Sequence, residues 1–358
     1  MEKTILEILL IVFTIAIIVA LIIPFIKKIA IHIDAVDLPN ERKVHTKPMP
    51  RLGGLGIFFG LLLGYMLFGK PSELMNSILI ASFIIVLTGL IDDVKPLKAN
   101  TKFIGQLIAS CIVVFYGGLA MQNISAFGFY IEFGFLAKFV TLFFILGCIN
   151  CINLIDGLDG LAGGISAIYF LTIGIITVVK GSYGLEFVLC FTMLGACLGF
   201  LVHNFYPAKI FMGDSGSMLL GLIIAVVALL GFKNVTLSSL IIPLLVLAIP
   251  ILDTMFAILR RKLKGESISK PDKFHIHHQL LNRNFSHRTT VLIIYVIDLL
   301  FASASIIYAL GNAKLGYVIY GFLLLIVLVF VIKTNVVIDH DTSDKIFNRI
   351  KNFKKKAK

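Results

Sequence analysis

The sequence predicts an all-α integral membrane protein that crosses the membrane about eleven times. Of its 358 residues, 58% are hydrophobic and only 15% are charged, and the mean hydropathy is +0.99. Soluble domains are about 45–50% apolar and about 25% charged, so this composition excludes an ordinary soluble enzyme. It also excludes a disordered chain, which requires low hydrophobicity.

Eleven apolar segments follow one another along the chain, and each approaches the roughly 20 residues that cross a bilayer core. They lie at residues 4–26, 52–69, 75–91, 103–120, 135–151, 161–179, 185–202, 216–232, 235–260, 291–310 and 315–333. No connection is long enough to fold separately, and no internal repeat is visible. We therefore expect a single transmembrane domain over residues 1–333 and a basic tail over residues 334–358.

Lysine and arginine are divided unequally between the two sides of this arrangement. Of the 32 basic residues, 26 lie in connections and a tail that share one side, namely residues 27–51, 92–102, 152–160, 203–215, 260–290 and 333–358. Positively charged loops stay in the cytoplasm, so we expect an outside N-terminus and a cytoplasmic C-terminus and tail. The net charge of +12 follows from this bias, suits anionic lipid headgroups and requires no nucleic-acid partner.

Polar residues gather on the predicted cytoplasmic side, whereas the opposite connections are short and nearly featureless. Five clusters stand out, at residues 42–56, 92–103, 150–160, 204–217 and 275–278. Their shared location predicts a site at the inner membrane face. The main alternative, a metal- or proton-coupled transporter, would place polar groups near the bilayer midplane on broken helices. A second alternative, a non-enzymatic membrane scaffold, would not account for these polar residues.

The first two clusters have features of a site for phosphate or metal. Residues 42–56 are basic and glycine-rich, and such residues bind phosphate and allow close backbone approach. Taken alone, they are explained better by a cytoplasmic loop followed by helix packing. Asp92 and Asp93 are adjacent carboxylates at a span end. A divalent cation or a nearby lysine would offset their repulsion, and a solvated helix end explains them equally well.

The third cluster is a polar stripe at the end of a span. Asn150, Asn153, Asp156 and Asp159 recur every three residues, which places them along one face of a helix. Amide and carboxylate oxygens suit a hard cation such as Mg²⁺. An unpartnered stripe of this kind would be costly beside lipid, so a purely structural explanation is weak.

The last two clusters admit both structural and functional explanations. Asp214 begins a span and could cap a helix or bind a metal, and Phe211 could stack on a base or pack at the interface. His275, His277 and His278 suggest a transition-metal site or a phosphate-binding patch. Because the inner loops hold no cysteine and many oxygen ligands, we favour the phosphate-binding patch.

Two further carboxylates, Asp253 and Asp298, lie in or near predicted spans. An intramembrane carboxylate is a candidate functional group by default. Both lie near the predicted inner side, so we expect snorkelling or pairing with local groups.

Taken together, the clusters resemble the polyprenyl-phosphate N-acetylhexosamine-1-phosphate transferases of glycosyltransferase family 4, which are integral membrane enzymes. The resemblance covers residues 37–290. It rests on Pro-Arg-Leu-Gly-Gly at 50–54, the Asp92–Asp93 pair, Asn-x-x-Asp-Gly-x-Asp-Gly at 153–160, Phe-Met-Gly-Asp-Ser-Gly-Ser at 211–217 and His-Ile-His-His at 275–278. It implies a multi-pass protein of the bacterial cytoplasmic membrane, with one transmembrane catalytic domain and its active site on the cytoplasmic face.

The implied reaction transfers GlcNAc-1-phosphate from UDP-GlcNAc to undecaprenyl phosphate, giving undecaprenyl-diphospho-GlcNAc and UMP. One pyrophosphate bond breaks and another forms, so no ATP is needed. Because two anions must meet, Mg²⁺ (or Mn²⁺) and Lys or His donors are expected to lower the barrier. A homodimer is compatible with this resemblance.

The resemblance also implies roles for individual residues. The implied metal ligands are Asp214 and Asn153. The implied catalytic residues are Asp92, Asp93, Lys102 and Asp156. The implied substrate-binding residues are Asp159 and Phe211 near uracil, His275, His277 and His278 near the diphosphate or sugar, and, more weakly, His45 and Lys47.

The sugar and the polymer are inferred from finer features. The His-Ile-His-His form and the long inner loop resemble the WecA/TagO type, which uses UDP-GlcNAc. The phospho-MurNAc-pentapeptide transferases, the alternative within the family, more often carry three consecutive histidines, which Ile276 interrupts here. A lysine-rich chain without tryptophan favours a Gram-positive source and the synthesis of wall teichoic acid.

Overall fold

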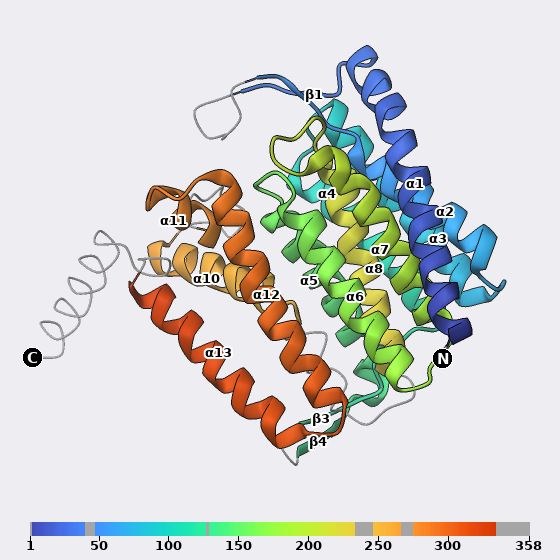
Figure 1. Cartoon of the computed structure of the whole chain (residues 1–358), viewed down its shortest axis with the longest axis vertical. Coiled ribbons are helices and arrows are strands. Elements are labelled where there is room, and N and C mark those ends of the chain that lie inside the picture. The colour runs from blue at the N-terminus through green and yellow to red at the C-terminus, as the bar shows by residue number, and fades with distance from the viewer. Residues whose placement is uncertain (1, 40–46, 127–128, 233–245, 266–274, 334–358) are drawn as a thin grey trace, which may run out of the picture.

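The computed structural model describes residues 2–39, 47–126, 129–232, 246–265 and 275–333 (Figure 1). Helices dominate these residues. They are α1 (Glu2–His32), α2 (Gly53–Phe68), α3 (Glu73–Val94), α4 (Ala99–Cys111), α5 (Ala137–Ile155), α6 (Leu161–Val179), α7 (Leu185–Asn204), α8 (Gly213–Phe232), α10 (Ala248–Lys264), α11 (Ile276–Asn282), α12 (His287–Ala309) and α13 (Ala313–Lys333).

Eight helical segments in the described part of the chain are long and apolar enough to cross a membrane. They are Thr4–His32, Glu73–Val94, Ala99–Tyr116, Gly134–Ile155, Leu161–Val179, Leu185–Asn204, Gly213–Gly231 and His287–Ala309. Two shorter apolar helices, Gly53–Phe68 and Lys314–Phe330, account for two more of the expected segments. The chain is therefore an all-α polytopic membrane protein.

The remaining expected segment, residues 235–260, lies partly outside the described residues. Its described part is α10, which carries a basic end and is not among the eight spanning segments. In Figure 1, α10 runs across the direction of its neighbour α12. α10 contacts α5 and α12, and it buries Asp253, Arg260 and Arg261 while Met255 and Leu259 stay exposed.

Short strands supplement the helices. β1 (Val36–Asp37) pairs antiparallel with β2 (Met49–Pro50), and β3 (Asn123–Ala126) pairs antiparallel with β4 (Phe129–Glu132). The β3–β4 hairpin corrects the expectation of featureless connections opposite the site. Its four-residue strands are flanked by long apolar helices, so their alternation is too brief to stand out in the sequence.

The bundle is organised around α8, whose spanning residues are almost entirely buried. It packs against α3 and α5, while α1 and α2 pack on α7. Small residues allow these close contacts: Gly195 and Gly199 of α7 lie against the backbone of α1. α12 packs against α6 and α13, which places the C-terminal helices beside this bundle (Figure 1).

A short backbone pairing joins the beginnings of α2 and α8. The amide of Phe211 donates to the carbonyl of Pro50 at 2.8 Å, and the amide of Gly53 donates to the carbonyl of Phe211 at 2.9 Å. Gly54 lies so close to Gly216 that a Cβ on Gly54 would fall 2.1 Å from the Gly216 nitrogen. The glycine-rich cluster therefore packs directly against the Phe-Met-Gly-Asp segment and positions Asp214.

Candidate active site

A cavity of about 530 Å³ lies at one end of the bundle. Seven of the thirteen site residues predicted from the sequence line it, and they come from four separate stretches of the chain. These seven are Lys47, Asn153, Asp156, Asp159, Phe211, Asp214 and His278. Asp92, Asp93, Lys102, His275 and His277 are not part of the lining, and His45 lies outside the described residues.

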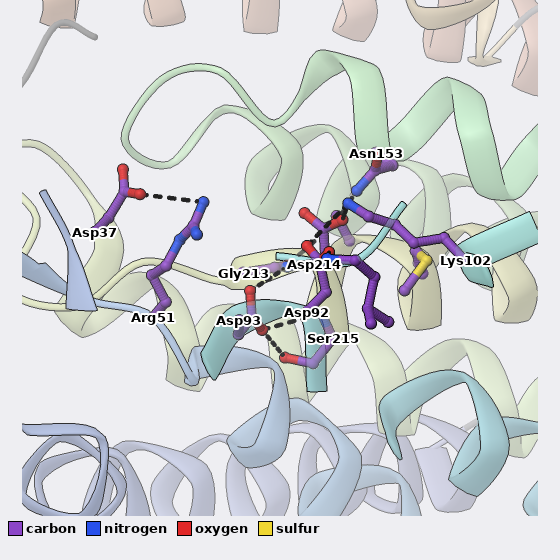
Figure 2. A network of polar contacts seen from close by, with 12 residues as sticks. Asp37, Arg51, Asp92, Asp93, Lys102, Asn153, Gly213, Asp214 and Ser215 are labelled. Atoms are coloured by element: carbon purple, nitrogen blue, oxygen red, sulfur yellow. Dashed lines mark hydrogen bonds and ion pairs between the residues drawn. The ribbon is translucent and has the colours of Figure 1, made fainter. Parts of the chain in front are cut away.

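Lys102 joins two carboxylates beside the cavity (Figure 2). Its Nζ lies 2.6 Å from Asp214 Oδ2 and 2.8 Å from Asp92 Oδ2, so one cation on α4 bridges α3 and α8. Asp92 also accepts a hydrogen bond from the amide of Leu97 at 2.7 Å. The lysine thus offsets the negative charge that adjacent carboxylates concentrate at this helix end.

Asp93 faces a different partner from Asp92. Its carboxylate accepts hydrogen bonds from the amide of Asp214 at 2.9 Å and from the hydroxyl of Ser215 at 2.8 Å. These are groups of the first turn of α8, where amides have no partner within the helix. Gly213 has φ +73°, and a Cβ there would fall 2.4 Å from Asp93 Oδ2. Asp93 therefore caps α8 from another helix, a function the sequence had suggested for Asp214 itself.

The expected polar stripe is helical for only half of its length. Asn150 donates to Gln106 Oε1 at 3.0 Å, and Asn153 donates to Ser217 Oγ at 2.8 Å. α5 ends at Ile155, so Asp156 and Asp159 lie in the following loop and not on the same helix face. The prediction of one continuous helical stripe was wrong, because the chain stops being helical after Ile155 and continues as a glycine-containing loop. Both aspartates nevertheless line the cavity.

Negative charge accumulates around Asp156. Loss of contact with water, followed by repulsion from Asp214 and Asp93, raises the pKa of Asp156 from 3.8 to about 7. A cation near these groups would relieve the repulsion. No group of three His, Cys, Asp or Glu side chains in the described residues is placed to enclose a metal ion. Mg²⁺ commonly binds one or two carboxylates together with substrate phosphates, so the oxygen ligands of Asp214 and Asn153 fit this ion.

Asp159 organises a turn that lines the cavity. Its Oδ2 accepts a hydrogen bond from the amide of Ala208 at 2.9 Å, and its own amide donates to His287 Nε2 at 2.9 Å. The ring of Tyr206 stacks on that of His287 with centroids 4.6 Å apart. Asp159 therefore ties together three segments that line the cavity, and Phe211 also lines it.

The three predicted histidines differ in their surroundings. His278 lines the cavity. His277 is buried against Gly157, where a Cβ would fall 2.6 Å from His277 Nε2. Burial, followed by the neighbouring His278 and His275, holds the pKa of His277 well below its usual value, so this ring is neutral at pH 7. His275 instead bonds to Asp253 on α10.

Arg51 and Asp37 also line the cavity, and they form an ion pair (Figure 2). A guanidinium nitrogen of Arg51 lies 3.2 Å from Asp37 Oδ1, and the amide of Arg51 donates to the carbonyl of Ala35 at 3.0 Å. The pairing of β1 with β2 brings the two side chains together. Arg51 therefore places a positive charge in a cavity wall that is otherwise rich in carboxylates.

Comparison with known proteins gives the family. The model of glycosyl transferase family 4 matches residues 75–232. The chain is 43% identical over 293 residues to a protein of Bacillus subtilis named probable undecaprenyl-phosphate N-acetylglucosaminyl 1-phosphate transferase, and the match covers 81% of each chain. The chain belongs to glycosyl transferase family 4.

More distant relatives are similar over comparable lengths. A decaprenyl-phosphate N-acetylglucosaminephosphotransferase of Mycolicibacterium smegmatis is 36% identical over 303 residues, covering 76% of this chain and 75% of the relative. An undecaprenyl-phosphate alpha-N-acetylglucosaminyl 1-phosphate transferase of Salmonella typhi is 30% identical over 275 residues, covering 75% of each chain. The family resemblance seen in the sequence motifs is thereby confirmed.

The family 4 match spans α3 to α8, and the cavity extends beyond it. Within the match lie Lys102, the Phe211–Ser217 segment and the carboxylates of Asp92, Asp93, Asp156 and Asp159. Outside it lie the Asp37–Arg51 pair, His278 and His287, which come from the chain on either side. Sequence reasoning did not assign Asp37, Arg51, Tyr206 or His287 to the site. Arg51 offered a signal, since it lies between a proline and the Gly-Gly pair.

Proposed function

We propose that this chain transfers GlcNAc-1-phosphate from UDP-GlcNAc to undecaprenyl phosphate and releases UMP. The observation that carries the proposal is the 43% identity, over 81% of each chain, to a relative named for that transfer. The polytopic membrane fold supports a lipid acceptor, because such a substrate is delivered from the bilayer. A cavity of about 530 Å³ at the end of the bundle has a volume typical of small-molecule sites.

The proposed step exchanges one phosphoanhydride bond for another. An oxygen of the lipid phosphate forms a bond to the phosphorus that carries the sugar, and the bond from that phosphorus to the UMP oxygen breaks. The lipid phosphate is already anionic at neutral pH, so little base assistance is needed. The barrier lies in bringing two anions together, and fixed positive charge lowers such a barrier.

The residues around the cavity supply this charge. Lys102, held by Asp92 and Asp214, would stabilise the phosphates during transfer. Asp214 and Asn153 would hold Mg²⁺ or Mn²⁺, and the bound ion would neutralise charge on the diphosphate oxygens. Asp93 would act by positioning the first turn of α8, as its hydrogen bonds to Asp214 and Ser215 suggest. Asp159 and Phe211 would contact the uracil.

We further propose an arrangement in the bacterial cytoplasmic membrane. The chain would cross it eleven times, with the N-terminus outside, residues 1–333 forming one catalytic domain, and the site and the basic 334–358 tail on the cytoplasmic side. The distribution of 26 of 32 basic residues supports this orientation. An impermeant thiol probe applied to intact cells should leave an Asp156→Cys variant unlabelled, and rapid labelling from outside would reverse the orientation.

The product would begin a cell-wall polymer such as wall teichoic acid. The purified protein should be assayed with undecaprenyl phosphate, Mg²⁺ and one of three donors: UDP-GlcNAc, UDP-GalNAc or UDP-MurNAc-pentapeptide. We expect UMP release from UDP-GlcNAc that is lost with EDTA and with Asp214→Ala. Turnover with the pentapeptide donor alone would instead identify a peptidoglycan enzyme, and turnover that persists in EDTA would contradict the metal sites.

A further inference from the structure

A buried carboxylate outside the proposed chemistry contacts the histidine cluster. Asp253 on α10 is only 3% exposed. Its Oδ2 lies 2.8 Å from His275 Nδ1, and its Oδ1 accepts a hydrogen bond from the amide of Ile276 at 2.7 Å. Both carboxylate oxygens are therefore directed at the point where α11 begins.

The contact with the Ile276 amide stabilises the start of α11. The first amides of a helix have no partner within it, and a negative charge is favourable there. α11 has only seven residues, Ile276–Asn282, and a helix this short gains little stability from its own hydrogen bonds. Asp253 thus links α11 to α10. α10 in turn packs against α5, the helix that carries Asn153.

The contact with the imidazole sets the orientation of the histidines. A carboxylate that accepts from Nδ1 holds one tautomer and one ring plane. The ring of His275 lies nearly parallel to that of His277, at an angle of 5° with centroids 5.7 Å apart. The His277 and His278 rings follow with centroids 4.3 Å apart. The buried carboxylate and the three rings thus form a continuous row that ends at His278, which lines the cavity.

We propose that Asp253 is a positioning residue that presents His278 to the donor diphosphate. This inference rests on the proposed function, since the diphosphate is that of the nucleotide sugar. It explains why three histidines are present although only His278 lines the cavity. His275 receives the anchor, His277 fills the space against Gly157, and His278 meets the substrate.

The test compares Asp253→Asn with Asp298→Asn in the purified full-length enzyme. Asp298 on α12 is equally buried, but its carboxylate has no hydrogen-bond partner among the described residues. Loss of a charged hydrogen bond typically costs about ten- to a hundredfold. We expect Asp253→Asn to raise KM for UDP-GlcNAc by about tenfold, with a smaller change in kcat. Asp298→Asn should leave KM unchanged.

A double mutant separates positioning from general loss of packing. If Asp253 acts through His278, then Asp253→Asn should add little to the KM of His278→Ala, since residues in one pathway are not additive. Effects that multiply in full would overturn the proposal, as would a wild-type KM in Asp253→Asn. A wild-type enzyme that releases no UMP from UDP-GlcNAc would instead refute the proposed function.

A second pair of variants keeps the proposal testable if Asp253→Asn does not fold. His275→Asn retains a side-chain N–H close to the place of Nδ1, whereas His275→Leu retains none. We expect KM to rise less in His275→Asn than in His275→Leu. Equal increases would mean that the bond to Asp253 does not matter.

Discussion

Replacing Gly89 with alanine should disable the site, although Gly89 itself does not line the cavity. Gly89 lies in α3, where the helix passes the first turn of α8. A Cβ at this position would fall 2.3 Å from both the nitrogen and the Cα of Ser215. The obstacle is backbone, so no side-chain rotation can relieve it.

The size of the displacement follows from these distances. Ordinary van der Waals contact begins at 3.4 Å, so the backbone of Ser215 must retreat by about 1 Å from its present 2.3 Å. Asp214 is the preceding residue and must move with it. A misplacement of about 1 Å near reacting groups costs on the order of a hundredfold in rate. Overpacking should also lower the free energy of unfolding by about 1–3 kcal/mol.

Gly147→Ala is the matched control, because it makes the same change in another apolar helix. No heavy atom lies within 4 Å of a Cβ built on Gly147, and alanine is the better helix former by about 1 kcal/mol. Its kcat should equal that of wild type. UMP release by each purified variant gives kcat and KM. A thiol-reactive dye reports unfolding, since Cys148, Cys190 and Cys197 are buried.

The expected result is a fall in kcat of about a hundredfold for Gly89→Ala and none for Gly147→Ala. A folded Gly89→Ala protein with kcat within about threefold of wild type would refute the reasoning. It would mean that the first turn of α8 tolerates a 1 Å shift and that the position of Asp214 is not critical.

Three further predictions concern charged groups around the cavity. Lys102→Met removes the cation between two carboxylates, so kcat should fall by about 10²–10³-fold, as for other preorganised electrostatic groups. Lys102→Arg keeps the charge and should lose less activity. Equal loss in both variants would contradict a charge effect. Arg51→Lys replaces the planar guanidinium, whose geometry matches both carboxylate and phosphate, with an ammonium group. KM for UDP-GlcNAc should therefore rise about tenfold. An unchanged KM would mean that the substrate does not contact Arg51. Because the pKa of Asp156 is raised to about 7, the folded state keeps a proton that the unfolded state releases, so stability should fall as pH rises from 5 to 7. The thermal midpoint in detergent, measured by size exclusion after heating, should show this slope in wild type and a flatter one in Asp156→Asn.

The membrane segments could be predicted from the sequence because lipid imposes a strong condition on the chain. A span must be apolar over about 20 residues, and ten of the eleven expected segments coincide with apolar helices. The eleventh expected segment, residues 235–260, is described only from residue 246, shortly before the basic-ended helix α10 begins, so this span stays a prediction.

The cavity residues could be predicted as residue types, but their partners could not. Polar side chains at the ends of spans are conspicuous in an apolar chain, and this is why seven predicted residues line the cavity. Pairs such as Asp253 with His275, and Asp37 with Arg51, join positions far from any shared motif. Their formation depends on how helices and strands cross, which periodicity along one element does not encode.

The two adjacent aspartates illustrate how helix geometry divides a repeated charge between two partners. Successive residues on an α-helix point about 100° apart, so Asp92 and Asp93 cannot face the same neighbour. Asp92 meets the Lys102 ammonium on α4, and Asp93 meets the unpaired amides at the start of α8. Each carboxylate thereby gains a favourable electrostatic partner on its own side of α3. The pair is tolerated in an apolar bundle because each carboxylate has its own polar partner, and both partners also involve Asp214: Lys102 contacts its side chain, and Asp93 accepts from its amide.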